Sequence, residues 1–454
     1  MENIRDTRKT LITDLTLVTF GNGVGAVLGF ASLVVVSHIL SPSDFGLFAI
    51  VITLMTVVVS ATDFGIPTTA TRFASACAFS QPGRAAAFLK ASFLIRITSS
   101  LIVMVLGVLF AAPIAEVLLK NVAYAGVVRI AFFGTLAISI GSFGNAIFQT
   151  WQQFGRLATY AIFANASRLI IICALGVFGS LGIYSGIFAY SLAPLLGATM
   201  VFIAAPRQLF QRSTAIEKRG IYSKIIHFNK WLGVAFLCDS IAIRLNLLVL
   251  SYLRGTDEVA IFAVALNVSL VLPIIIVALL STLLPRVSLM HTRSELWTYI
   301  KHSVSVSTGI GILFIPFVIF SSQIVEMIFG IEYSASGVVM RILIMGFMIN
   351  LIVNPLYTIL YPLNKTRAIA ALSVPNLIGM VLLTYFLAPN YGALGAAYSY
   401  LITTSVWAVL MVFVVIASIA KMPSSLSEIS EPATTDDVSD LPLVHSVLKQ
   451  QVTD

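Results

Sequence analysis

Long apolar segments recur along this chain, and each is about as long as a helix must be to cross a bilayer. A hydrocarbon core of about 30 Å requires roughly 20 apolar residues per helix. The runs are continuous and lack the alternation with a period of two that marks a membrane β-strand. The pattern predicts an all-α integral membrane protein with twelve spans, at 15–39, 45–66, 90–112, 126–149, 157–179, 183–205, 231–253, 259–284, 303–329, 338–361, 368–388 and 393–420.

The composition excludes a water-soluble globule. Hydrophobic residues make up 58% of the 454 residues and charged residues only 10%, and the mean hydropathy is +0.99. Too little polar surface remains to cover a soluble domain of this size. The start of the chain carries Arg5, Arg8 and Lys9. The apolar run that follows is too long for the core of a signal peptide, so we expect it to remain as the first span.

The positively charged residues are distributed unevenly between the two sides of the predicted membrane protein. The chain holds 27 Lys and Arg against 19 Asp and Glu. Among the predicted loops and tails, those on one side carry nearly all of the Lys and Arg, and the other side holds only Lys120 and Arg254. Cytoplasmic loops of membrane proteins carry such an excess, so we expect both termini in the cytoplasm. The orientation of the protein in the membrane explains the excess of Lys and Arg over Asp and Glu, so no nucleic-acid partner is expected.

Two halves of the chain resemble each other. SHILSPSDFGLFAIV (37–51) aligns without gaps on SYLRGTDEVAIFAVA (251–265), and LGIYSGIFAYSL (181–192) matches YGALGAAYSYLI (391–402). Arg156 and Arg367 fall at equivalent turns, so the offset is about 210 residues throughout. Because six spans are an even number, both copies enter the membrane in the same direction. Such parallel repeats are related by an axis along the membrane normal.

The repeat divides the chain into four predicted parts. These are a six-helix lobe (1–206), a basic cytoplasmic linker (207–230), a second six-helix lobe (231–420) and a tail (421–454). The linker carries six positive charges and interspersed isoleucines, so an interfacial helix and a solvated loop are equally compatible with it. The tail is rich in Ser, Pro and acidic residues, which predicts disorder.

No enzyme signature is present in the sequence. Gly21-Asn22-Gly23-Val24-Gly25-Ala26 fits a dinucleotide fingerprint, but it lies inside an apolar helix with no preceding strand. Its small residues instead favour close packing of another helix. The cysteines at 77, 173 and 238 lack metal-site spacing, and the five histidines do not pair at i, i+4. We therefore expect a protein that is not an enzyme and has neither a metal nor a cofactor.

Charged residues inside spans are the strongest functional candidates. Arg168 lies about 18 Å past Arg156 along a helix, and Arg244 about 21 Å past Lys230. Asp239 lies about 13 Å into the same helix as Arg244. A charge at such depth costs at least about 2.5–3.5 kcal/mol and usually faces a bundle interior or a wet cavity. One interpretation is a cationic cavity for an anionic head group, and the other is capping or pairing that fixes helix packing.

Four further residues carry weaker signals. Arg96 follows Lys90 by six residues, so its side chain could reach the interface. Asp63 ends the second span and suits either a coupling cation or proton or a pair with the loop residue Arg72. Asn22 and Asn246 lie in the first helix of each half, where cavity lining and hydrogen bonding between helices are equally compatible.

Several motifs together resemble one branch of a transporter superfamily. The chain resembles the polysaccharide-transporter, or oligosaccharide flippase, branch of the multidrug/oligosaccharidyl-lipid/polysaccharide exporter superfamily. The motifs that carry this resemblance are LSPSDFG (40–46), DFGIPTTATR (63–72), GTDEVAIFAVA (255–265), LPRVS (284–288), FGIEYSAS (329–336) and YGALGAAYSYLI (391–402). The resemblance implies two six-helix bundles in a V shape around a central cavity. It also implies that the protein flips a polyprenyl-pyrophosphate-linked oligosaccharide across the bacterial cytoplasmic (inner) membrane for surface polysaccharide biosynthesis.

The family also supplies expectations about the site. The pyrophosphate would be neutralised by Arg244, Arg168, Arg96 and Arg72, because a guanidinium donates paired hydrogen bonds to phosphate. Many members carry an aspartate where this chain has Asn246, which leaves Asp239 or Asp63 for coupling to a proton or sodium gradient. Membrane lipids, a polysaccharide polymerase and chain-length-control proteins are the implied partners.

Three other functions compete with this interpretation. A cation-coupled multidrug exporter of the same superfamily would favour carboxylates and aromatic residues over buried arginines. A flippase of peptidoglycan lipid precursors is closer in chemistry. A scaffold or polymerase of surface-glycan assembly belongs to a different class, and a polymerase would carry a large outer loop that this sequence lacks.

Overall fold

The computed structural model describes residues 2–210, 220–276, 292–360 and 366–420, together with Leu279 and Val287. Within these residues every regular element is a helix. The α-helices are α1 (Glu2–Ile39), α2 (Pro42–Asp63), α3 (Ile66–Ser75), α4 (Pro82–Leu109), α5 (Ala111–Leu119), α6 (Ala125–Thr150), α7 (Phe154–Val177), α8 (Ile183–Ala204), α10 (Ile221–Arg254), α11 (Thr256–Ser269), α13 (Arg293–Ile312), α14 (Ile315–Ile319), α15 (Ser321–Phe329), α16 (Ser336–Tyr357) and α17 (Thr366–Ala420). Short 3₁₀ turns follow at Val122–Tyr124, Arg207–Phe210, Ile331–Tyr333 and Thr358–Leu360.

Ten described segments are long and apolar enough to cross a membrane. The multi-pass character expected from the sequence is confirmed, while the number twelve stays a prediction. The last segment runs from Arg367 to Ala420 and takes in both of the final predicted spans, with a non-helical Gly392 at φ 56° between them. The predicted span 303–329 is divided among α13, α14 and α15, with Pro316 in the first turn of α14.

Local sequence fixes the ends of α2. The side chain of Ser41 accepts a hydrogen bond from the backbone N–H of Asp44, and Pro42 occupies the first turn, where its missing N–H costs nothing. At the other end Phe64 and Gly65 both adopt left-handed conformations, with φ 43° and 71°. Glycine tolerates this geometry without strain. The chain therefore turns directly after Asp63 and starts the short helix α3.

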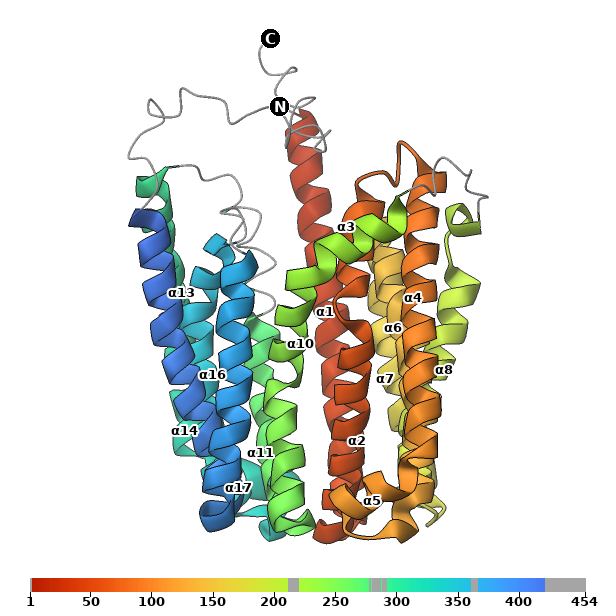
Figure 1. Ribbon diagram of the computed structural model, residues 1–454, viewed down its shortest axis with the longest axis vertical. Helices are drawn as coiled ribbons and strands as arrows, with labels where there is room; N and C mark the ends of the chain where they lie inside the picture. Colours follow the sequence, from red (N-terminus) through yellow and green to blue (C-terminus); the bar gives the residue numbers. More distant parts are fainter. Residues whose placement is uncertain are drawn as a thin grey trace.

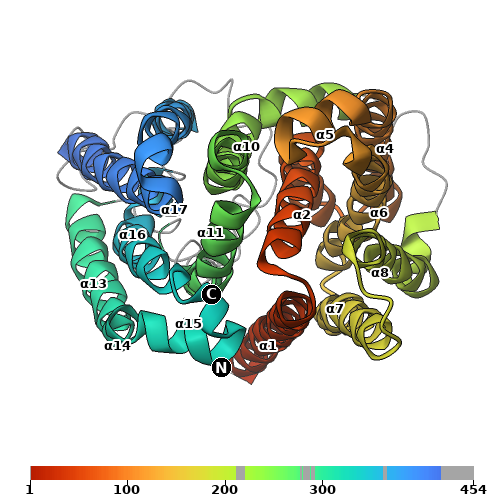
Figure 2. The same cartoon turned by 90° about the horizontal axis from the view of Figure 1, so that it is seen from below.

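The helices form two groups that follow the order of the chain. Figure 2 shows α1–α8, the N-terminal half, on one side and α10–α17, the C-terminal half, on the other. Within the N-terminal half α1 packs on α7 and α6 on α8, and within the C-terminal half α17 packs on α10 and α16. Helix α2 lies against both α10 and α11, so these three helices make the main contact between the halves.

Helix α10 begins ten residues earlier than the predicted span and joins both halves. Its first residue, Ile221, lies inside the predicted linker. Ile221 and Ile225 are buried against Ala74 and Phe88 of the N-terminal half, and later turns pack on α17. Figure 1 shows the resulting long diagonal course of α10. This described part of the linker is helical and rests on protein. Residues 211–219 and the predicted tail 421–454 lie outside the described residues.

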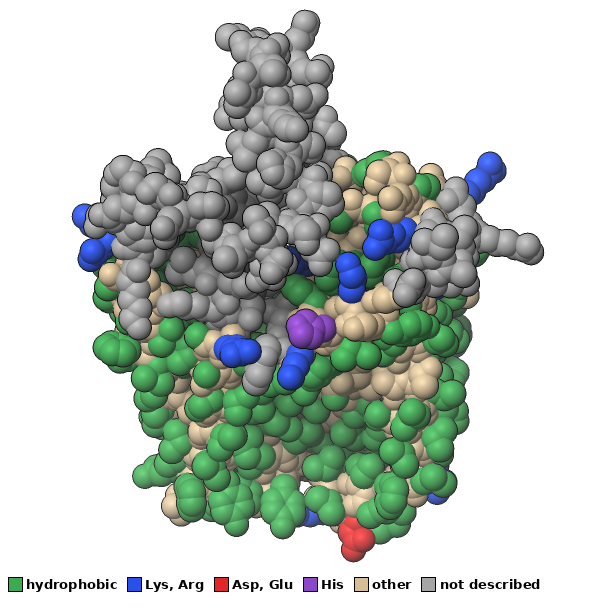
Figure 3. Space-filling view, turned by 45° about the horizontal axis from the view of Figure 1, so that its top comes forward, with side chains coloured by type: hydrophobic (Ala, Val, Ile, Leu, Met, Phe, Trp, Pro, Cys, Tyr) green, Lys and Arg blue, Asp and Glu red, His purple; other side chains and the backbone are tan. Residues whose placement is uncertain are grey.

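The two ends of the bundle differ in charge. Figure 3 shows Lys and Arg side chains gathered near one rim above a broad apolar belt. We call this rim, with Arg72, Arg84, Arg156 and Arg207, the basic end. The belt includes large side chains that are strongly exposed, such as Ile203 at 87% and Phe413 at 70%. Apolar surface on this scale fits a lipid environment.

One group of contacts between the halves lies at the end opposite the basic end. The hydroxyls of Ser43 and Thr256 lie 2.9 Å apart, and the His38 ring lies 2.9 Å from the carbonyl oxygen of Ile328. Tyr333 stacks edge-on against Phe45, with ring centroids 5.8 Å apart. The halves are therefore joined here by polar and aromatic contacts.

Candidate substrate site

Arg96 of α4 is held by partners on two neighbouring helices. It is 1% exposed, and its Nη2 lies 3.6 Å from Asp63 Oδ2 and donates a hydrogen bond of 2.8 Å to Ser142. The Asp63 partner is therefore this arginine inside a span, and not Arg72, which was predicted to lie in a loop and which the structure places in the last turn of α3. Because both Arg96 and Asp63 are engaged, neither is free to bind a substrate without breaking a buried ion pair.

Arg168 of α7 has a different environment, without a carboxylate. Its guanidinium carbon lies 4.5 Å from the centre of the Tyr190 ring, and its Nη1 donates to Asn165 Oδ1 at 3.2 Å. The Tyr160 hydroxyl interacts electrostatically with both Arg168 and Arg96. Arg168 and Arg96 each lie fourteen residues after the start of their helices, at about 21 Å along the axis. Both arginines thus lie at a similar depth in their helices, within electrostatic range of the buried Tyr160.

The charge of Arg168 has no counterpart in the second half of the chain. At the offset of 211 residues that relates Arg156 to Arg367, Asn165 falls on Asn376 and Arg168 falls on Gly379. Asn165 Oδ1 accepts from Arg168, whereas Asn376 Oδ1 is buried with no hydrogen-bond partner among the residues that the structure describes. The repeat therefore conserves the amide but places the cation in the N-terminal half alone.

Arg244 of α10 makes no hydrogen bond, ion pair or aromatic contact with any residue that the structure describes. It is half-buried, and it continues a row of residues four apart that begins with Phe236 and Ser240. Such residues lie above one another on one helix face. Phe236 is 38% exposed, and Ser240 and the neighbouring Asp239 are exposed. We call this the open row of α10.

Asn246 lies on the other side of the same helix. Two residues along an α-helix correspond to a rotation of about 200°, so Asn246 faces away from Arg244, in a buried row with Cys238 and Ala242. Its Oδ1 accepts a hydrogen bond of 2.7 Å from Thr384, and its Nδ2 donates to the carbonyl of Ala396 at 3.2 Å. Of the two roles predicted for Asn246, this geometry favours bonding between helices.

The remaining candidates lie apart from these clusters. Arg72 stacks over the Phe228 ring at 4.2 Å, and partial burial lowers the pKa of its guanidinium from the usual value. Asn22 is exposed on α1. Asp239 lies near Ser373 of α17. Among the described residues no hydrogen bond or ion pair links Arg244 to α4 or α7, the helices that carry Arg96 and Arg168.

Sequence reasoning missed three residues that organise the site. Tyr190 stacks against Arg168, and Tyr160 is buried within electrostatic range of Arg96 and Arg168. Asn229 links the halves by accepting a 3.0 Å hydrogen bond from Thr69 and donating to the carbonyl of Phe64. Tyr190 was marked by the repeat, since it aligns with Tyr400. Neither Tyr160 nor Asn229 has a sequence signal, because their partners come from distant segments.

Solved structures of two membrane proteins share this polytopic helical fold. The inward-facing conformation of a multidrug resistance transporter of the MATE family superposes with a TM-score of 0.70 at 16% identity, over 92% of this chain and 96% of that one. The lipid II flippase MurJ in an inward closed conformation gives a TM-score of 0.68 at 13% identity, over 89% of each chain.

The family follows from the sequence comparison. A family model described as polysaccharide biosynthesis protein matches residues 11–291, so the chain belongs to that family, and the predicted resemblance is confirmed. A Shigella flexneri protein named "Putative O-antigen transporter" is 23% identical over 247 residues, which are 53% of this chain and 59% of the relative. The match thus spans little more than half of that relative.

Proposed function

We propose that this protein flips a polyprenyl-pyrophosphate-linked oligosaccharide across the bacterial cytoplasmic membrane during surface polysaccharide biosynthesis. The observation that carries the proposal is the pair Arg168 and Arg244. Both are arginines deep in candidate spans without an ion-pair partner among the described residues, in a chain of the polysaccharide biosynthesis family. An unpaired cation at that depth is costly unless it borders water or an anionic ligand.

The chemistry of the substrate fits these residues. A pyrophosphate offers several anionic oxygens to a guanidinium, which stays charged at any relevant pH and donates parallel hydrogen bonds. The open row of α10 would receive the head group while the polyprenyl tail stays in lipid. Arg96 is bound to Asp63 at 3.6 Å, so we assign it to the framework of the site and leave direct binding to Arg168 and Arg244.

The same proposal includes the layout and orientation of the protein. Two six-helix lobes would enclose a central cavity, with the open row of α10 on its wall and both termini in the cytoplasm beside the basic end. The fold likeness to MATE and MurJ transporters supports this layout. The charged rim in Figure 3 supports the orientation through the positive-inside rule. Polymerase and chain-length-control proteins would act on the delivered substrate.

Coupling to a proton or sodium gradient is assigned to Asp239. Asp63 already has an ion-pair partner, whereas Asp239 is exposed on α10 beside the open row. Replacement Asp239→Asn should remove the dependence of transport on an imposed gradient while leaving substrate binding in place. Gradient-driven transport at the normal rate in this variant would contradict the assignment.

A binding measurement tests the anion site directly. Purified protein would be titrated with a polyprenyl pyrophosphate, and the affinity of Arg244→Ala should fall at least about tenfold, because a charge-assisted hydrogen bond is worth about 1.5–3 kcal/mol. Arg244→Lys should retain part of the affinity. Arg129→Ala is the matched control, since Arg129 is an exposed span arginine away from the open row. Equal losses in both alanine variants would refute a specific site.

A multidrug exporter of the same fold would behave differently. It would bind cationic drugs, and removal of Arg244 would leave that binding unchanged or strengthen it. The absence of carboxylates around Arg168 argues against this class, because its described partners are Asn165 and Tyr190.

A further inference from the structure

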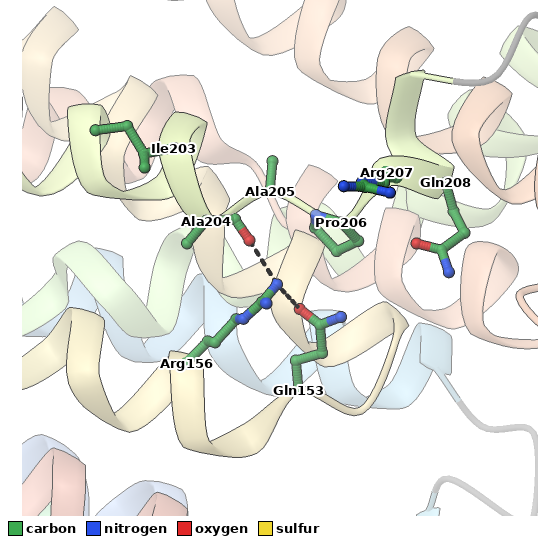
Figure 4. A pocket seen from close by; sticks show the side chains of 8 residues that line it. All are labelled: Gln153, Arg156, Ile203, Ala204, Ala205, Pro206, Arg207 and Gln208. Carbon is green, nitrogen blue, oxygen red and sulfur yellow. Dashed lines mark hydrogen bonds between the residues drawn. The ribbon is translucent and has the colours of Figure 1, made fainter.

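A pocket of about 400 Å³ opens at the basic end of the N-terminal half. Gln153 and Arg156 line it from the start of α7, and Ile203, Ala204, Ala205, Pro206, Arg207 and Gln208 line it from the end of α8 and the turn beyond. Figure 4 shows Arg156 reaching across to the end of α8, while Arg207 and Gln208 close the other side next to Pro206. Both helices are candidate spans that begin or end here, so the pocket lies level with the membrane surface.

The polar lining of this pocket carries two positive charges and no acidic residue. Arg156 Nη1 donates to Gln153 Oε1 at 2.9 Å and to the carbonyl of Ala204 at 2.7 Å. These two bonds orient the guanidinium without neutralising it. Arg207 makes no hydrogen bond or ion pair with a residue that the structure describes. The remaining guanidinium donors are therefore available to an anion.

The apolar surroundings indicate what carries that anion. Ile203, which lines the pocket, is 87% exposed, and Phe202 and Phe210 beside it are 57% and 64% exposed. Side chains of this kind at a span end suit acyl chains and not water. A ligand with an anionic head group for the arginines and acyl chains for the apolar surface is an acidic phospholipid. The pocket volume also leaves ample room for a phosphodiester, given that a water molecule takes about 30 Å³.

We propose that Arg156 and Arg207 bind the phosphate of an anionic phospholipid of the leaflet at the basic end. This peripheral site lies apart from the open row of α10, and it goes beyond the proposed transport of a lipid-linked sugar. A bound lipid would bridge the start of α7 and the turn after α8. It would thereby stabilise the N-terminal half and not take part in transport chemistry.

The chain supplies a close internal control. The sequence Gln-Phe-Gly-Arg at 153–156 starts α7, and Gln-Pro-Gly-Arg at 81–84 starts α4. Arg84 also donates to the glutamine three residues before it, at 3.5 Å. Arg84 is not among the residues that line the pocket. Both arginines thus share their local setting, and only Arg156 belongs to the pocket.

The test follows the thermal unfolding midpoint of the full-length protein in micelles titrated with phosphatidylglycerol. A ligand that binds only the native state raises this midpoint. We expect a saturable rise for the native protein and for Arg84→Gln, and none with phosphatidylcholine. Arg207→Gln should need about fivefold more phosphatidylglycerol, because one arginine near a lipid surface contributes about 1 kcal/mol. Arg156→Gln combined with Arg207→Gln should show no saturable rise.

Two results would overturn the proposal. One is a rise of the unfolding midpoint in Arg207→Gln at the same phosphatidylglycerol concentrations as in the native protein. This variant breaks no described hydrogen bond, so it still decides the question if the double variant fails to fold. The other is an equal rise with inorganic phosphate, which would assign the pocket to a free anion instead of a lipid. Neither result depends on transport, so the flippase proposal is tested separately.

Discussion

Arginines inside the spans of this protein fall into two groups, those paired with a carboxylate and those without one. Arg96 is 1% exposed and is fixed by Asp63 and Ser142. Arg168 and Arg244 lack a described carboxylate partner, and Arg244 lies on the exposed side of its helix. A buried ion pair holds helices in register but offers no charge to a ligand. An arginine without a counter-ion keeps its charge available.

The first prediction concerns the buried pair. Arg96→Ala should lower the free energy of unfolding by about 3 kcal/mol, because it leaves the Asp63 carboxylate buried without its counter-ion. The value lies at the lower end of the usual range because the Asp63 side chain is 35% exposed. Ser142→Ala removes a single hydrogen bond to the same arginine and should lower the free energy of unfolding by about 1.5–3 kcal/mol. Chemical unfolding in detergent measures both, and an unchanged stability of Arg96→Ala would show that the pair is not formed.

At the scale of elements, close packing between helices depends on positions without a side chain. A Cβ added at Gly46 of α2 would overlap the backbone carbonyl of Thr256 at the start of α11, whereas one added at Gly23 of α1 would meet nothing within 4 Å. Since α2 and α11 belong to different halves, the contact at Gly46 sets how closely the halves approach. Backbone cannot yield as a flexible side chain can, so the overlap must separate the helices.

The second prediction follows from this contrast. Gly46→Ala should lower the unfolding midpoint markedly, with a cost of about 1–3 kcal/mol from overpacking. Gly23→Ala should leave the midpoint unchanged or raise it, because alanine is the better helix former by about 1 kcal/mol. Thermal unfolding of the two purified variants, followed in parallel, decides the matter. A Gly46→Ala protein as stable as Gly23→Ala would contradict the close approach of α2 and α11.

Much of the helical layout could be predicted from apolar runs, and the exceptions have physical causes. The run 183–205 corresponds to α8 (Ile183–Ala204), because hydropathy and helix coincide there. The run from 303 to 329 is broken near Pro316, where the chain lacks a backbone donor. Helix α4 begins at Pro82, well before the predicted start at 90, because its first turns are packed on protein, with residues 85–89 all buried.

The candidate site was less accessible to sequence reasoning. Depth along a helix singled out Arg168 and Arg244 as candidates, since residue spacing gives depth directly. Partners depend on which helices become neighbours. The pairing of Asp63 with Arg96, the buried bonds of Asn246 and the role of Tyr160 all join segments that are distant in sequence. No local pattern encodes these contacts.

At the scale of the whole molecule, the start of α10 contacts the N-terminal half through Phe228 and Asn229 near the basic end, and further contacts join the halves at the opposite end. Ser43 and Thr256 meet there at 2.9 Å, and His38 meets the Ile328 carbonyl. If transport requires the halves to part at this end, these contacts must break in each cycle. The structure therefore represents a state in which this end is shut.

The third prediction uses a reversible cross-link at this end. Ser43→Cys with Thr256→Cys, in a background with the three native cysteines replaced by alanine, should form a disulfide on oxidation. Transport should stop in the oxidised protein and return after reduction, because the halves can no longer separate. Each single cysteine variant serves as a control and should be insensitive to oxidation. Full transport by the cross-linked protein would show that this end does not open.

The central claim is that Arg168 and Arg244 receive a pyrophosphate, and the most direct measurement follows that substrate across a membrane. Vesicles containing the purified protein would be loaded with a fluorescent polyprenyl-pyrophosphate-linked sugar, and its appearance in the opposite leaflet would be timed. We predict that Arg168→Met combined with Arg244→Met slows transfer at least about a hundredfold, from the loss of two charge-assisted contacts. Arg129→Met should transfer at the native rate. Native-rate transfer by the double variant would contradict the account.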